Sequence, residues 1–105
     1  MKPNYPYPKS EDEFYSRSYS VDQLIENYTF PMLMHYYVFG LNVLQRIESV
    51  IEGELYDELG VEPEQVEQDK MHFTLRTVIV RNAMTKMNAC ELLMCQNAVM
   101  VQILN

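Results

Sequence analysis

The sequence predicts a mainly α-helical protein: an elongated helical hairpin of two long helices, preceded by a short helix and an extended arm. Two observations predict this fold class. Apolar residues recur every three or four positions over the stretches 31–59 and 63–104, the spacing that places them on one side of a helix. Between these stretches, Gly60 and then Pro63 are typical of one helix ending and another beginning.

The first twenty residues predict an extended N-terminal arm, distinct from a single helical domain over 21–105. Pro alternates with Tyr at its start, and Pro favours an extended backbone and lacks the amide hydrogen that a helix interior needs. Ser10, followed three residues later by Glu13, forms a possible capping box. A short turn of helix around 11–16 is therefore an alternative for part of the arm.

An arm of this composition offers rigid aromatic side chains to another protein surface. We expect five of them to bind a partner: Tyr5, Tyr7, Phe14, Tyr15 and Tyr19. The alternative is that the arm folds back onto the hairpin of its own chain.

Capping residues also place the next two helices. Ser20 with Gln23 repeats the capping pattern, and the apolar spacing that follows predicts a short helix at about 21–28. Pro31 suits the first turn of a long helix, where its missing amide hydrogen costs nothing. That helix is expected to reach Leu59, along the apolar stripe Tyr37, Leu41, Leu44, Ile47, Ile51 and Leu55.

The second long helix is expected from about 63 to 104, with Glu64 at its electropositive start. Its apolar stripe is the predicted partner-binding face: Leu75, Ile79, Ala83, Met87, Cys90, Met94, Ala98 and Val101. Residues 72–80 are rich in β-formers and could instead form a strand. We favour the helix because the chain offers no second strand-like run to pair with.

The predicted shape implies other protein chains. Helices of about 28 and 42 residues would be about 42 and 63 Å long, which exceeds the size of a compact globule of this length, about 13 Å in radius of gyration. Two helices have too few neighbours to cover their apolar faces. We therefore expect a homo-oligomer or a subunit of a hetero-complex.

Composition limits the kinds of partner and compartment. The chain has 105 residues and a formal charge of −7, from 15 acidic and 8 basic side chains, which argues against binding to a nucleic-acid backbone. We expect no signal peptide and no membrane span. With free thiols as the default for its two cysteines, an intracellular (cytoplasmic) location, or one within a virion, is expected.

Negative charge is concentrated where the two long helices are joined. Nine carboxylates and no Lys or Arg lie within Glu48–Asp69. We call four of them the acidic tip: Glu52, Glu54, Asp57 and Glu58. A basic partner or a divalent cation could bind there, but a solvated surface that maintains solubility is the commoner use of such a segment.

Catalytic and metal-binding patterns are not recognisable, so no enzyme activity, cofactor or metal is expected. His35 and His72, the two histidines, are predicted on different helices. Cys90 and Cys95 lack the two further ligands, at ligand spacing, that a zinc site needs. Acidic pairs around Gly60 fall in the wrong order for a helical magnesium-dependent pyrophosphohydrolase.

Two functions remain for a chain of this kind. The leading hypothesis is a non-enzymatic structural or assembly subunit of a larger complex, such as a virion, acting through helix packing and its N-terminal arm. The alternative is a small acidic inhibitor or regulator that binds a basic site on a target protein. Neutralising the acidic tip distinguishes them, because only the inhibitor needs its charge for binding.

Overall fold

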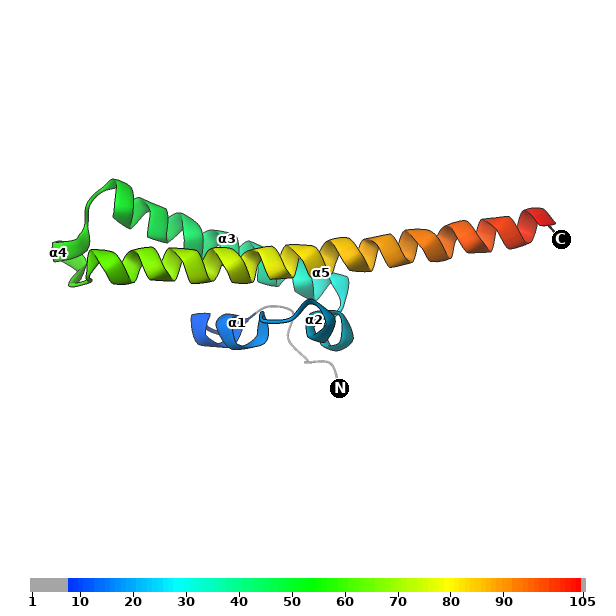
Figure 1. Cartoon of the computed structure of the whole chain (residues 1–105), viewed down its shortest axis with the longest axis horizontal. Coiled ribbons are helices and arrows are strands. Elements are labelled where there is room, and N and C mark those ends of the chain that lie inside the picture. The colour runs from blue at the N-terminus through cyan, green and yellow to red at the C-terminus, as the bar shows by residue number, and fades with distance from the viewer. Residues whose placement is uncertain (1–7, 105) are drawn as a thin grey trace.

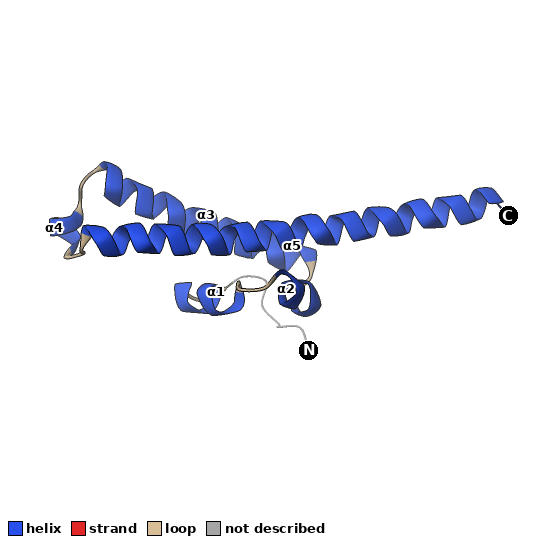
Figure 2. Ribbon diagram, in the orientation of Figure 1, coloured by secondary structure: helices blue, strands red, loops and turns tan. Residues whose placement is uncertain are grey.

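The computed structural model describes the backbone of residues 8–104 and the side chains of residues 8–89. In chain order its helices are α1 (Glu11–Arg17), α2 (Val21–Asn27), α3 (Phe30–Glu52), α4 (Tyr56–Leu59) and α5 (Pro63–Leu104). The described backbone contains no strand, as Figure 2 shows. The predicted mainly α-helical class is confirmed, and residues 72–80 are helical.

The long helices α3 and α5 form an antiparallel hairpin, with α4 at the turn and α1 and α2 along one side (Figure 1). The molecule measures 69 × 27 × 17 Å along its principal axes. Its elongation comes from α5, whose 42 residues extend well beyond the start of α3 (Figure 1). The predicted elongated hairpin is therefore confirmed.

The seam between α3 and α5 has a seven-residue repeat. Buried or half-buried residues follow one another at alternating spacings of about three and four, as in a coiled coil. On α3 they are Leu33, Tyr36, Gly40, Val43, Ile47 and Val50, and on α5 they are Val66, Lys70, Phe73, Thr77, Val80, Met84 and Met87. Midway, the helices approach closely because Gly40 has no side chain to meet Thr77.

The turn between the long helices differs in part from the prediction. The first long helix was expected to continue to Leu59, but α3 ends at Glu52 and Gly53 follows as its C-cap. Glu54 then adopts a positive φ of 49°, so the chain turns before α4. Gly60 ends α4 in the left-handed conformation, with φ 67°, and α5 begins at Pro63, both as predicted.

Residues 11–17 of the predicted N-terminal arm form α1, so this part of the arm is helical and not extended. Ser10 Oγ accepts a hydrogen bond from Glu13 N at 3.1 Å, and this cap starts α1. Of the alternatives drawn from the sequence, the structure therefore favours the capping box over extended backbone for residues 11–17. Ser20 caps α2 in the same way, through Gln23 N, as predicted.

The short helices α1 and α2 both pack onto the hairpin. The buried core joins Phe14 of α1, Leu24 of α2, residues of α3 and residues of α5 in one cluster. Among the described residues, no helix combines the length and the hydropathy that crossing a bilayer requires.

Candidate interaction surfaces

The hairpin has two unlike sides, which we name the closed face and the open face. The closed face is the side on which α1 and α2 pack. It includes Arg46 of α3, which binds Glu11 of α1 at 3.0 Å, and Arg76 of α5, whose guanidinium lies 4.3 Å from the ring centre of Tyr15. Neither α1 nor α2 covers the other side in Figure 1.

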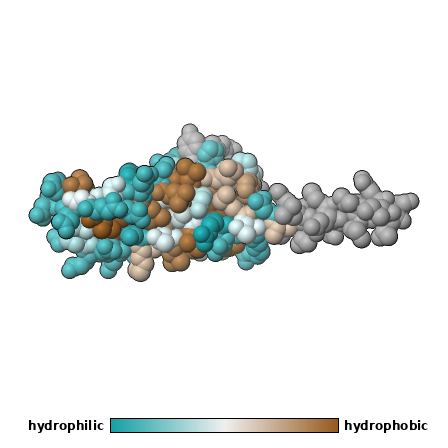
Figure 3. Space-filling view, turned by 90° about the horizontal axis from the view of Figure 1, so that it is seen from above, coloured by the Kyte–Doolittle hydropathy of each residue, from teal (hydrophilic) through white to brown (hydrophobic). Residues whose placement is uncertain are grey.

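Helix geometry identifies the residues of the open face. At about 100° per residue, Leu41 and Leu44 point to the opposite side of α3 from Arg46. On α5, the same rotation directs Met71, Thr74 and Val78 away from Arg76. These five residues define the open face. Figure 3, viewed from above, shows hydrophobic side chains among hydrophilic ones on the side of the hairpin away from α1.

Phe14 is the centre of the closed face. The ring is fully buried and stacks on Phe73, with centroids 5.8 Å apart and planes 5° from parallel. It also meets Phe39 at 5.5 Å and Tyr36 at 6.1 Å. The sequence predicted Phe14 as an anchor for a partner protein. In this structure it serves the chain's own core, because three rings of the hairpin enclose it.

The other predicted arm residues are placed differently. Tyr15 lies partly exposed between His72 and Phe73, at centroid distances of 6.0 and 6.2 Å. Tyr19 is 55% exposed and remains available to another surface. Tyr5 and Tyr7 lie outside the described residues. Of the three expected anchors that the structure describes, Phe14 is therefore buried, whereas Tyr15 and Tyr19 are exposed.

A chain of polar side chains links α1, the C-cap residue of α2 and α3. The Tyr28 and Tyr36 hydroxyls share a hydrogen bond of 3.2 Å, and Arg17 Nη1 donates to Tyr28 Oη at 3.3 Å. Burial first, and then the bond with Tyr28, raises the pKa of Tyr36 above its ordinary value. The bond to Tyr28 likewise raises the pKa of Arg17. Tyr36 is therefore held neutral, as a hydrogen-bonding group.

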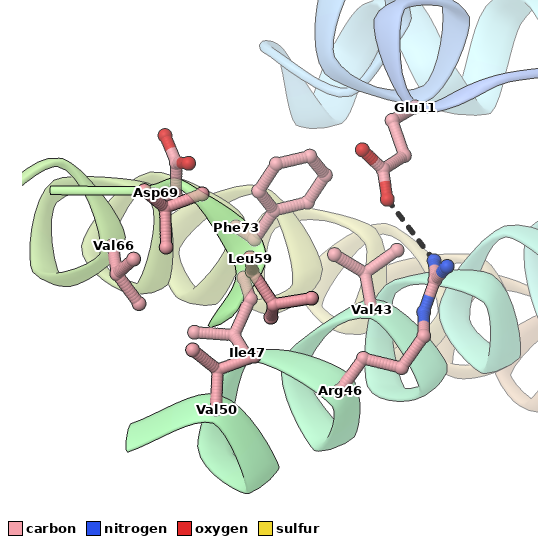
Figure 4. A pocket seen from close by; sticks show the side chains of 10 residues that line it. Glu11, Val43, Arg46, Ile47, Val50, Leu59, Val66, Asp69 and Phe73 are labelled. Atoms are coloured by element: carbon pink, nitrogen blue, oxygen red, sulfur yellow. Dashed lines mark hydrogen bonds and ion pairs between the residues drawn. The ribbon is translucent and has the colours of Figure 1, made fainter. Parts of the chain in front are cut away.

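The closed face also contains a pocket of about 190 Å³ between α1, α3 and α5 (Figure 4). Its walls are mostly apolar: Val43, Ile47, Val50, Leu59, Val61, Val66 and Phe73. The Glu11–Arg46 ion pair lies at one edge, and Asp69 contributes a second carboxylate. Such a lining suits an apolar group with a polar end, although the pocket is open to solvent.

The predicted partner-binding face of α5 is divided by the packing. Ala83 is fully buried, and Ile79 and Met87 pack against the core. Leu75, by contrast, is 57% exposed. The remaining members of that stripe, Cys90, Met94, Ala98 and Val101, lie on α5 beyond the described side chains. Within the described part, Leu75 alone of this set is free to meet a partner.

The acidic tip lies at the hairpin turn. Glu52, Glu54, Asp57 and Glu58 are all exposed, and none forms an ion pair with another described residue. Within residues 8–89, no three His, Cys, Asp or Glu side chains are grouped so as to hold a metal ion. The tip is an uncompensated negative surface.

Sequence reasoning missed the Arg17–Tyr28–Tyr36 chain and the pocket. The signal for the seam was present, since the seven-residue repeat through Tyr36 and Phe73 is readable from the sequence. No local pattern, however, joins Arg17 to Tyr28, because their contact depends on how α1 and α2 dock. The chain matches no family model, no curated protein and no solved structure.

Proposed function

We propose that the protein is a non-enzymatic structural or assembly subunit of a larger protein complex, such as a virion or a similar multi-chain assembly. The observation that carries this proposal is the apolar surface left uncovered on α5. Met71 is 60% exposed and Leu75 57% exposed, although the same helix buries Val80 and Ala83 completely on its inner side. Apolar groups gathered on an exposed helix favour contact with another chain.

The length of α5 supports the same proposal. Its backbone runs to Leu104, past the level at which α3 begins (Figure 1). The sequence of its last third contains Leu92, Leu93, Val99, Met100 and Ile103, which occupy several sides of a helix. A helix with apolar residues on more than one face is normally covered by other elements, and the described backbone places no other helix beside this end of α5 (Figure 1).

The test is the solution mass of the purified full chain by light scattering, with circular dichroism at the same concentration. We expect a defined mass that is a multiple of 12.4 kDa and a strongly helical spectrum. A helical monomer at all concentrations would remove self-assembly from this proposal and favour the alternative function.

The alternative is a small acidic inhibitor or regulator that binds a basic site on a target protein. It is supported by the acidic tip, whose carboxylates are exposed and unpaired within the described residues. The test replaces Glu52, Glu54, Asp57 and Glu58 by their amides and measures both oligomer mass and binding to a polylysine surface. Loss of binding with unchanged mass supports the alternative; loss of mass supports a role of the tip in assembly.

A matched control neutralises carboxylates elsewhere. Asp12 and Glu26 are also exposed and lie on α1 and α2, away from the tip. The substitutions Asp12→Asn and Glu26→Gln make the net charge less negative without changing the tip. If they weaken polylysine binding as much per charge, the binding reports overall charge, and the tip is not a site.

A further inference from the structure

A charged stripe with unlike ends lies along the outer side of α5. Glu67, Met71, Thr74, Val78 and Arg81 follow one another at spacings of four, three, four and three, so they share one side of the helix. We call them the 67–81 stripe. Four of them line an open hollow on the surface of α5 together with Lys70 and Leu75: Glu67, Met71, Thr74 and Val78.

The two charged ends of the stripe are not neutralised within the described chain. Glu67 and Arg81 are both exposed, and neither forms an ion pair with a described residue. Lys70 is half-buried at a seam position, so it lies to one side of the stripe. The stripe therefore has a negative charge at one end and a positive charge at the other, with apolar side chains between them. This charge distribution gives the surface a direction.

We propose that the 67–81 stripe binds the same stripe of a second copy of this chain, with the two α5 helices antiparallel. The inference rests on the proposed assembly function and names its partner. Glu67 and Arg81 each lie seven residues from Thr74, about 10.5 Å along the helix. A two-fold axis at Thr74 therefore places Glu67 of each copy beside Arg81 of the other, and Met71 near Val78.

Charge decides between the two directions of pairing. In a parallel arrangement Glu67 would face Glu67, and Arg81 would face Arg81, so like charges would repel at both ends. The antiparallel arrangement makes two opposite-charge contacts, and like an in-register parallel pair it has the two-fold symmetry usual for a homodimer. The stripe is thus complementary to itself in one direction only.

The extent of the contact sets the expected affinity. An axis at Thr74 pairs Pro63 with residue 85 of the second copy, so the helices overlap over about 33 Å. Leu75 and the α3 residues Leu41 and Leu44 flank this contact. An interface one helix wide is small compared with the roughly 800 Å² per partner of a typical stable complex. We therefore expect a dimer that dissociates at micromolar concentrations.

The first experiment reverses the charges in the full chain and measures dimer dissociation by sedimentation. Glu67→Arg alone and Arg81→Glu alone should each raise the dissociation constant by about tenfold, equal to about 1.4 kcal/mol. The double variant Glu67→Arg/Arg81→Glu should restore the original value. A mixture of the two single variants should form a heterodimer tighter than either homodimer, because every facing pair is then opposite in charge.

The second experiment measures register and direction by disulfide formation, with Cys90 and Cys95 replaced by serine. Thr74→Cys places a thiol at the proposed axis, and Thr85→Cys is the matched control. Both threonines are exposed, and each donates a hydrogen bond to the carbonyl four residues earlier. Mild oxidation should link Thr74→Cys into a covalent dimer and leave Thr85→Cys without an intermolecular disulfide. Linking of both would indicate a parallel pair and overturn the proposal.

The remaining outcomes separate this inference from the proposed function. If neither charge reversal changes the mass or the dissociation constant of the oligomer, the inference is overturned. The assembly function is then still supported, because other surfaces must hold the copies together. A monomer at all concentrations overturns both the inference and self-assembly. Any partner of the stripe would then be a different protein. Circular dichroism of each variant confirms that the helices are intact, and the mixed heterodimer reports pairing even where one variant alone is less stable.

Discussion

The closed and open faces of the hairpin are built from the same two helices but reach different packing. On the closed face, Phe14 of α1 and Leu24 of α2 complete the core, and Phe14 is enclosed by Tyr36, Phe39 and Phe73. On the open face, Met71 is 60% exposed. The short N-terminal helices therefore act as a third layer that covers one side only. The difference shows that both sides of the hairpin carry apolar residues, but the described chain covers only one side, with α1 and α2.

The largest effect is expected where the closed face loses its central ring. Phe14→Ala should lower the free energy of unfolding by about 3–5 kcal/mol, because it removes a buried ring and leaves a cavity. Val38→Ala is the control, since Val38 is an exposed apolar residue of α3 and should change stability by less than about 0.5 kcal/mol. Urea denaturation followed by circular dichroism measures both. Equal losses would contradict the distinction between an enclosed core and an exposed helix side.

A methyl group at the centre of the seam should have the next largest effect. A Cβ at Gly40 would lie 2.9 Å from Phe14 Cζ and closer still to Thr77 Oγ1. Gly40→Ala should therefore cost about 1–3 kcal/mol by overpacking, despite the better helix propensity of Ala. Gly53→Ala is the milder comparison, because its φ of −85° suits any residue and its added Cβ would come no closer than 3.1 Å to a neighbouring atom, Leu55 Cγ. Thermal unfolding compares the two, and a stabilised Gly40→Ala would show that the helices can move apart.

Tyr36 should make the free energy of unfolding depend on alkaline pH. The pKa of Tyr36 is raised in the folded state, so its hydroxyl stays neutral where the unfolded chain would ionise. Stability from this group is complete below the ordinary tyrosine pKa of about 10 and is lost as the pH rises above it. Tyr36→Phe should flatten this decline. Urea denaturation between pH 8 and 11 measures it, with Tyr19→Phe, an exposed tyrosine, as the control.

The smallest effect is expected at the edge of the closed face. The Glu11–Arg46 ion pair, at 3.0 Å, joins α1 to α3 but is largely solvent-exposed, so Arg46→Gln should cost about 0.5 kcal/mol and less at high salt. In a Glu11→Gln background the same change should cost almost nothing. This double-mutant cycle isolates the pair. A coupling above about 2 kcal/mol would contradict the prediction that this exposed ion pair contributes little to the docking of α1.

Much of the fold could be predicted because its signals are local. Ser20, Gly60 and Pro63 each fix a helix end through groups within a few residues, and all three act as predicted. The α3–α4 turn at Gly53 was missed because the apolar pattern continues through it to Leu55. There the repeat alone does not distinguish a continuous helix from a helix, a turn and a second helix.

The candidate surfaces were less predictable because apolar residues of α3 occupy a wide arc. The predicted stripe through Leu41 and Leu44 follows the open side of that arc, whereas Tyr36 and Val43 form the seam. Which row becomes the seam depends on the partner helix. The same holds for Phe14, whose burial depends on Phe73, a residue far along the chain. Contacts of this kind, between residues far apart in the chain, cannot be predicted from the spacing of residues within one helix.

The stacking of Phe14 on Phe73 also sets an order of events during synthesis. Phe14 leaves the ribosome early, but the ring that covers it belongs to α5, which is made much later. Until α5 emerges, α1 and α2 have no completed surface on which to dock, and an aromatic side chain remains in water or on a chaperone. The third layer of this protein, although first in sequence, is therefore expected to assemble last.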